Sequence, residues 1–195
     1  MGQFGDSGYG RSSERGRKIT RVLTVGHGTL DAAGFAALVR GAHIERIADV
    51  RSVPRSRAHP HFWKERMGAW IPDLAGASYD WRPALGGFRK PKPESLNVSL
   101  RHPSFRGYAD YMETDNFVNA LTDLLRDAAE QELAIMCSET LWWRCHRRLI
   151  SDALVLLHGA EVRHLMHDGA LKEHSLTSGV RRISEATLRY DGESW

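Results

Sequence analysis

A strand, a tight turn and a helix follow one another in residues 22–40, VLTVGHGTLDAAGFAALVR. The β-branched run at residues 22–25 is typical of a buried strand, and the glycines of residues 26–28 permit a sharp turn. The apolar side chains of residues 31–40 then recur at the spacing of one helix face. This unit is the first step of an alternating strand and helix pattern.

The same alternation continues along the chain. Strand patterns recur at residues 44–50, 77–81, 133–137 and 161–166, and helical patterns at residues 62–74, 108–130 (with a break near Asp115) and 141–157. Parallel strands need long crossover connections, which helices provide. The sequence therefore predicts an α/β fold, a Rossmann-like three-layer sandwich with a mostly parallel sheet of about five strands.

A length of 195 residues suits one compact domain. We expect a single α/β domain at residues 21–195, preceded at residues 1–20 by a flexible basic tail rich in Gly, Ser and Arg. No apolar stretch approaches the roughly 20 residues that a membrane span needs. The N-terminus also lacks the apolar core of a secretory signal. We therefore expect a cytoplasmic protein with no membrane partner.

The chain has two cysteines, Cys137 and Cys145. Two are too few for a disulfide scaffold or a four-cysteine zinc module built from this chain alone. We expect both to be free thiols.

Positive charge is concentrated in two segments that follow predicted strands. Residues 51–66 contain five basic and one acidic residue, and residues 80–106 contain six basic and two acidic residues. Ligands of open α/β sheets bind beyond the carboxyl ends of the strands, where these segments would meet. We therefore expect an anionic ligand such as a phosphate, although a solvated basic surface would have the same composition.

The turn at residues 24–29, TVGHGT, exposes backbone N–H groups at the start of a helix and could hold an anion. It is a poor dinucleotide fingerprint, because Asp31 would place a carboxylate near the pyrophosphate. Asp49 does imitate the ribose-binding acid of such sites. No nicotinamide or flavin cofactor is predicted. His27 is a candidate for proton transfer or, alternatively, satisfies local backbone groups.

The loop at residues 49–57, DVRSVPRSR, presents three arginines after the second strand. Guanidinium groups bind phosphate or carboxylate through two parallel hydrogen bonds. The alternative for Asp49 is an ion pair with Arg51 or with another arginine of the loop. The later Gly86-Gly87 pair would allow a ligand to approach the backbone closely.

The segment at residues 136–148, MCSETLWWRCHRR, contains the candidate nucleophile. We expect Cys145 in the first turn of a helix, where the helix dipole and the neighbouring arginines favour its thiolate. Glu139 and His146 are candidates for general acid or base.

Two other interpretations apply to this segment. Cys137, Cys145 and His146 could ligate a metal, but adjacent residues of a helix point about 100° apart, which disfavours that arrangement. Cys137 could instead be a buried strand residue without a chemical role.

Taken together, these segments resemble a family of uncharacterised bacterial proteins called domain of unknown function 488. The resemblance extends from residue 24 to residue 166 and rests on residues 24–27, 49–57, 85–87, 105–112, 136–139 and 145–150. It implies a Rossmann-like α/β domain with a polar site drawn from these segments, and no particular reaction. The family usually has Asp-Pro shortly before its Cys-His-Arg, where this chain has Leu141-Trp142-Trp143-Arg144.

Our leading hypothesis is an enzyme acting on a phosphate-bearing substrate, a nucleotide or a nucleic acid. Its candidate catalytic residues are Cys145, Glu139, His146 and His27, and its candidate binding residues are Arg51, Arg55, Arg57, Gly86, Gly87, Arg147 and Tyr108. The alternative is a non-catalytic nucleic-acid-binding module, in which basic loops hold the backbone and tryptophans stack on bases. A third hypothesis is thiol or sulfur-transfer chemistry at Cys145.

Overall fold

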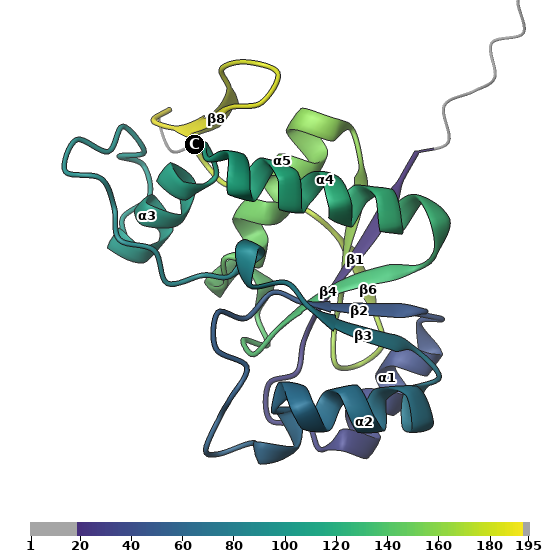
Figure 1. Cartoon of the computed structure of the whole chain (residues 1–195). Helices are drawn as coiled ribbons and strands as arrows, with labels where there is room; N and C mark the ends of the chain where they lie inside the picture. The colour runs from purple at the N-terminus through teal and green to yellow at the C-terminus, as the bar shows by residue number, and fades with distance from the viewer. Residues whose placement is uncertain (1–18, 193–195) are drawn as a thin grey trace, which may run out of the picture.

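The computed structural model describes residues 19–192, so residues 1–18 of the predicted tail lie outside the described part (Figure 1). The main elements are, in chain order, β1 (Arg21–Gly26), α1 (Ala32–Gly41), β2 (Arg46–Asp49), α2 (Lys64–Ala75), β3 (Ser78–Trp81), α3 (Pro103–Tyr111), α4 (Asp115–Glu130), β4 (Leu133–Cys137), α5 (Arg147–His158), β5 (Glu161–Leu165), β6 (Leu171–Glu173), β7 (Val180–Arg182) and β8 (Leu188–Tyr190). Short 3₁₀ helices occupy Pro60–Phe62, Pro83–Leu85 and Trp142–Arg144.

The sheet confirms the predicted α/β class. Its strand order is β3-β2-β4-β1-β5-β6, and all neighbours are parallel except β5 and β6. The strands β7 and β8 form a separate antiparallel pair. The five parallel strands are those that the sequence predicts, whereas β6, β7 and β8 were not predicted.

Helices cover both faces of the sheet, which gives three layers (Figure 1). On one face α1 and α2 bury a cluster that includes Phe35, Phe62 and Ile71. On the other face α3, α4 and α5 bury a larger cluster that includes Tyr108 and Leu149. The strand β4 is buried along its whole length, as expected for a strand covered on both sides.

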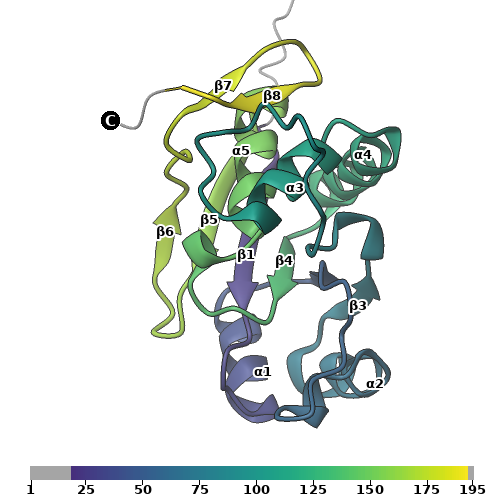
Figure 2. The same cartoon turned by 90° about the vertical axis from the view of Figure 1, so that its left-hand side faces the viewer.

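The position of β4 opens a crevice in the sheet. This strand lies between β1 and β2, side by side with β1 in Figure 2. The helices that follow β1 and β2 lie on one face, whereas α5, which follows β4, lies on the other (Figure 1). The chain segments leaving these strands therefore separate at their carboxyl ends, and such a topological switch point is where α/β sheets bind ligands.

The predicted helix at residues 141–157 was wrong at its start. Trp142–Arg144 form a 3₁₀ turn, Cys145 is extended with φ −125° and ψ 153°, and α5 begins only at Arg147 with His146 as its N-cap residue. Trp142 is held out of the helix because its ring stacks on His164 of β5, with 3.9 Å between the ring centroids. Cys145 therefore precedes the helix.

The break expected near Asp115 is confirmed, because α3 ends at Tyr111 and Thr114 caps α4 through its side chain. Within residues 19–192, no helix is both long enough and apolar enough to cross a membrane.

Candidate active site

A cavity of about 700 Å³ occupies the crevice at the carboxyl ends of β1, β2 and β4. The segments that follow β1, β2, β3 and β4 all contribute to its lining, and they include the two basic segments that were predicted to meet there. Of the predicted site residues, the cavity is lined by His27, Arg51, Arg55, Gly87, Tyr108, Glu139, Cys145 and His146. Cys137 also reaches the lining, although it is the last residue of a buried strand.

Cys145 lies at the inner wall of this cavity, with 5% of its surface exposed. Its Sγ atom accepts a hydrogen bond from Nε of Arg147 at 3.5 Å and lies 3.6 Å from Nδ1 of His146. Arg147 also donates to the backbone oxygen of Glu139, which fixes the guanidinium behind the thiol. The Cys145 sulfur thus has a guanidinium N–H and an imidazole nitrogen as neighbours.

The orientation of His146 follows from its second ring nitrogen. Nε2 lies 2.9 Å from the carbonyl oxygen of Val50, which can only accept, so Nε2 carries a hydrogen and donates it. Nδ1 therefore faces Cys145. A Cβ on Gly87 would lie 3.0 Å from Nδ1, and the Tyr108 ring packs beside the imidazole with centroids 5.1 Å apart. A glycine at position 87 thus gives the imidazole room.

The two thiols have opposite pKa shifts. Burial alone would raise the pKa of Cys145, but hydrogen bonding to Cys137 and the charge and N–H groups of Arg147 outweigh it and lower the pKa to about 6. Hydrogen bonding to Cys145, followed by burial, raises the pKa of Cys137 to about 12. The proton shared by the pair therefore stays on Cys137, and Cys145 is the thiolate at neutral pH.

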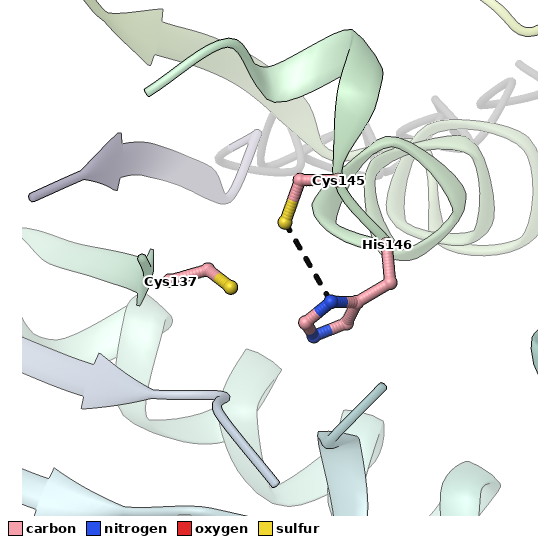
Figure 3. Close-up of side chains that lie close together, drawn as sticks. All are labelled: Cys137, Cys145 and His146. Carbon is pink, nitrogen blue, oxygen red and sulfur yellow. Dashed lines mark hydrogen bonds between the residues drawn. The ribbon is translucent and has the colours of Figure 1, made fainter. Parts of the chain in front are cut away.

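Cys137, Cys145 and His146 could also hold a metal. Their Sγ and Nδ1/Nε2 ligand atoms lie within 4.8 Å of one another (Figure 3). The expectation that Cys145 and His146 point apart was wrong, because it assumed that both belong to one helix, whereas Cys145 is extended.

Residues 31–154 match the protein family described as domain of unknown function DUF488. The chain belongs to this family. No curated protein and no solved structure matches the chain. The DUF488 match spans the loops that carry Arg51, Gly87 and Cys145, whereas His27 and β5 to β8 lie outside it.

Within the DUF488 region, Arg51 has internal partners. Its Nε and Nη2 donate to both carboxylate oxygens of Asp49 at 2.6–3.1 Å, and Nη2 also donates to the Phe62 carbonyl oxygen at 2.8 Å. The Asp49–Arg51 ion pair was the alternative left open by the sequence. Both side chains are buried, so this pair fixes the loop that follows β2.

His27 is also held by internal contacts, just before the DUF488 match begins. Its Nδ1–H donates to the Gly28 carbonyl oxygen at 2.9 Å, and its Nε2 faces Arg51 at 3.3 Å. Its ring stacks on Phe62 with centroids 4.0 Å apart. Burial, followed by the charge of Arg51, lowers the pKa of His27 to about 3, so this imidazole is neutral.

The remaining predicted site residues divide into those that line the cavity and those that do not. Arg55 and Glu139 are exposed side chains that line the cavity. Arg57 is exposed but does not line it, and Gly86 packs against Ser52. The structure adds one exposed cation that the sequence did not single out, Arg144, which lines the cavity.

A chain of buried polar side chains behind the cavity was not predicted from the sequence. His164 lies 2.7 Å from Oγ1 of Thr24 and 3.0 Å from His174, whose Nε2–H donates to Asp152 at 2.9 Å. Tyr190 donates to the other Asp152 oxygen at 3.0 Å. Because Trp142 stacks on His164, this chain supports the segment that leads to Cys145. Its members are far apart in sequence, so no local pattern indicates it.

Proposed function

We propose that this DUF488 domain is an enzyme that acts on a phosphate-bearing substrate, with Cys145 as the nucleophile and His146 as the proton carrier. The observation that carries the proposal is the placement of the Cys145 sulfur, which lies between His146 Nδ1 and Arg147 Nε and at the wall of the cavity. A nucleophile beside a base that is itself oriented by a third group is the arrangement of covalent catalysis. Here the third group is the Val50 carbonyl oxygen.

The charges of the cavity support an anionic substrate. Arg55 and Arg144 line it as exposed cations, and neither has an ion-pair or side-chain hydrogen-bond partner within residues 19–192. Glu139 is the one carboxylate among the lining residues. The Arg55 guanidinium lies over the Trp63 ring, 5.1 Å from its centroid, and this contact with the ring face leaves its N–H groups without a hydrogen-bond acceptor in the described part of the chain. Such guanidinium groups can bind a phosphate through paired hydrogen bonds. Arg51 also lines the cavity, but its guanidinium is paired with Asp49, whereas Arg147 lies behind the lining and contacts the Cys145 sulfur.

The reaction begins with attack of the Cys145 thiolate on the phosphorus atom. The S–P bond forms as the P–O bond to the leaving alcohol breaks, and Nδ1 of a protonated His146 gives its proton to the departing oxygen. Water then attacks phosphorus and passes a proton to Nδ1 as the S–P bond breaks. This step releases phosphate and restores both side chains, so the net reaction is hydrolysis of the ester.

The proposal is tested by trapping the thiophosphate. Reduced, chelator-treated protein is mixed with a panel of phosphomonoesters and nucleotides, quenched in seconds and analysed by peptide mass spectrometry. A phosphate adduct on Cys145, with turnover lost in Cys145→Ser, is the expected result. Equal turnover by Cys145→Ser and wild type would show that Cys145 is not the nucleophile.

The binding role is tested separately. Arg55→Ala and Arg144→Ala should each raise KM about tenfold, since a hydrogen bond to a charged group contributes about 1.5–3 kcal/mol. Arg57→Ala is the matched control, because Arg57 is an exposed cation of the same loop that does not line the cavity. An equal rise of KM in Arg55→Ala and Arg57→Ala would mean that the arginines attract the substrate by their overall charge, without a specific contact in the cavity.

One observation favours a nucleic acid as a second candidate ligand. Phe88 lines the cavity and is 87% exposed, and an exposed ring beside free arginines can stack on a base. A non-catalytic nucleic-acid-binding module would bind oligonucleotides with a steep salt dependence, because phosphate contacts release counterions. Phe88→Ala should then weaken binding of a single-stranded oligonucleotide, and Cys145→Ser should leave it intact.

A further inference from the structure

We propose that Cys137, Cys145 and His146 form a binding site for a thiophilic divalent ion such as Zn²⁺, with a fourth coordination position that opens into the cavity. Cys137 comes from the end of β4, and the other two residues come from the segment that enters α5. Figure 3 shows the three side chains directed toward a common point. Their ligand atoms lie within 4.8 Å of one another, and all three residues line the cavity.

The spacing of the donor atoms fits tetrahedral coordination. With metal bonds of about 2.3 Å to sulfur and about 2.0 Å to nitrogen, a tetrahedral ion separates these ligands by about 3.5 Å. The observed distance between Cys145 Sγ and His146 Nδ1 is 3.6 Å. A pair of thiolates on the same ion would lie about 3.8 Å apart, so a small side-chain rotation of Cys137 completes the set.

The residues around the three ligands orient them as in metal sites. A ligating histidine normally donates its second ring N–H to a carbonyl or carboxylate, and His146 Nε2–H donates to the Val50 carbonyl oxygen at 2.9 Å. In the neutral imidazole that hydrogen bond leaves Nδ1 with a lone pair directed at Cys145, and this is the form that binds a metal. Arg147 donates to the Cys145 sulfur, which stabilises the thiolate form that metals require.

The donor chemistry selects the metal. Two thiols and one imidazole suit Zn²⁺ or Co²⁺, whereas Mg²⁺ and Ca²⁺ prefer oxygen ligands. Three protein ligands with an open fourth position distinguish this site from a closed structural zinc site. Binding releases the Cys137 proton, and the two thiolates then neutralise the two charges of the ion. The positive charge of Arg147 remains beside the ion, so an anionic group from the cavity is a suitable fourth ligand.

The metal site itself does not depend on the proposed function. Regulation of the enzyme by the bound ion does rest on the proposed function. A metal bound to the Cys145 sulfur occupies the lone pair that would attack a substrate. The ion and the substrate therefore compete for one atom, and removal of the ion releases the nucleophile.

The site is tested by titrating reduced, chelator-treated full-length protein with Co²⁺ and then displacing it with Zn²⁺. We expect one ion per chain, a thiolate-to-metal charge-transfer band and the intense visible bands of tetrahedral cobalt. Cys137→Ser, Cys145→Ser and His146→Asn should each weaken binding at least tenfold. His102→Asn is the matched control, because His102 is an exposed histidine of the same cavity outside the cluster.

A second measurement separates this site from the proposed function. One equivalent of Zn²⁺ should slow the alkylation of Cys145 by iodoacetamide at least tenfold in wild type and much less in Cys137→Ser. Absence of the cobalt bands, or equal binding by wild type and Cys137→Ser, would overturn the metal site. Either result leaves the thiophosphate experiment unaffected, because that experiment is done without metal.

Discussion

Arg147 donates from Nε to the Sγ atom of Cys145 across 3.5 Å, and the residue is 1% exposed. Within residues 19–192, no carboxylate forms an ion pair with this buried cation. A buried charge without a counter-charge is costly, and the nearest group that can supply one is the Cys145 thiolate. The reactive form of the cysteine is therefore stabilised by the same contact that neutralises the arginine.

The first prediction concerns the reactivity of Cys145. With a pKa of about 6, the thiol should be mostly ionised at pH 7, and iodoacetamide should alkylate it with a half-maximal rate near pH 6. Arg147→Gln removes the charge and should move that midpoint upward by about one unit or more, equivalent to about 1.4 kcal/mol. The measurement is the pH profile of Cys145 alkylation in metal-free protein, followed by peptide mass spectrometry.

Arg147→Lys is the control for that variant, because it keeps the charge and loses the planar donor set. It should move the midpoint less than Arg147→Gln does. A midpoint near 9 in the wild type, or the same midpoint in all three proteins, would contradict the role assigned to Arg147.

The second prediction concerns the space that Gly87 leaves for His146. A Cβ at this position would lie 3.0 Å from Nδ1 and 3.3 Å from Cγ of the ring, so Gly87→Ala should displace the imidazole from Cys145. We expect alkylation of Cys145 at pH 7 to change severalfold while the melting temperature falls by only a few degrees.

Gly41→Ala is the matched control for Gly87→Ala, because a Cβ there meets nothing within 4 Å. It should leave the reactivity of Cys145 unchanged. Equal reactivity of Gly87→Ala and wild type would mean that the imidazole position does not depend on the glycine.

The parts of this fold that the sequence predicts are those set by local pattern. Residues 133–137 read as a buried strand and form β4 with those bounds. Because strand ends determine where loops emerge, the convergence of His27, Arg51 and Cys145 on one cavity also follows from the pattern.

The parts that the sequence misses depend on contacts between distant residues. Residues 141–146 have a helical pattern, but Trp142 stacks on His164, which lies 22 residues later, and the helix starts late. The proximity of Cys137 to Cys145 likewise follows from that extended segment. The short strands β6 and β7 are exposed and rich in charge, so they lack the apolar alternation that indicates a strand.

The third prediction concerns the buried Asp152, which accepts hydrogen bonds from His174, Tyr190 and the Thr177 backbone. Tyr190→Phe removes one donor from a fully buried carboxylate and should lower the free energy of unfolding by about 1–3 kcal/mol. Urea denaturation at pH 7 measures this change. Arg181→Ala breaks a solvent-exposed ion pair with Asp191 and should lower the free energy of unfolding less than Tyr190→Phe does. A smaller loss for Tyr190→Phe than for Arg181→Ala would contradict the importance of the buried chain.

The fourth prediction concerns acid stability and rests on two buried histidines. Burial, followed by nearby positive charges, lowers the pKa of both His27 and His164 from 6.5 to about 3. Below pH 6.5 these two histidines therefore become protonated in the unfolded chain but stay neutral in the folded chain. Their stabilising contribution is complete above pH 6.5 and is lost as the pH falls toward 3, at about 1.4 kcal/mol per pH unit for each group.

Urea denaturation at pH 6 and pH 5 measures this effect together with that of His158, whose pKa is also lowered from 6.5 by burial, followed by the charge of Arg182. The lowered pKa of Cys145 acts mainly between pH 9 and 6, and the lowered pKa values of Asp127 and Asp191 act below 3.8. The wild-type free energy of unfolding should fall over this interval. His27→Gln and His164→Gln should each reduce the fall by more than His158→Gln does, because their pKa values are lowered to about 3, whatever the stability of the variants at pH 7. Equal stability of the wild type at both pH values would mean that the imidazoles of His27 and His164 accept protons in the folded state. The assignment of His27 as a neutral imidazole that accepts a hydrogen bond from Arg51 would then be wrong.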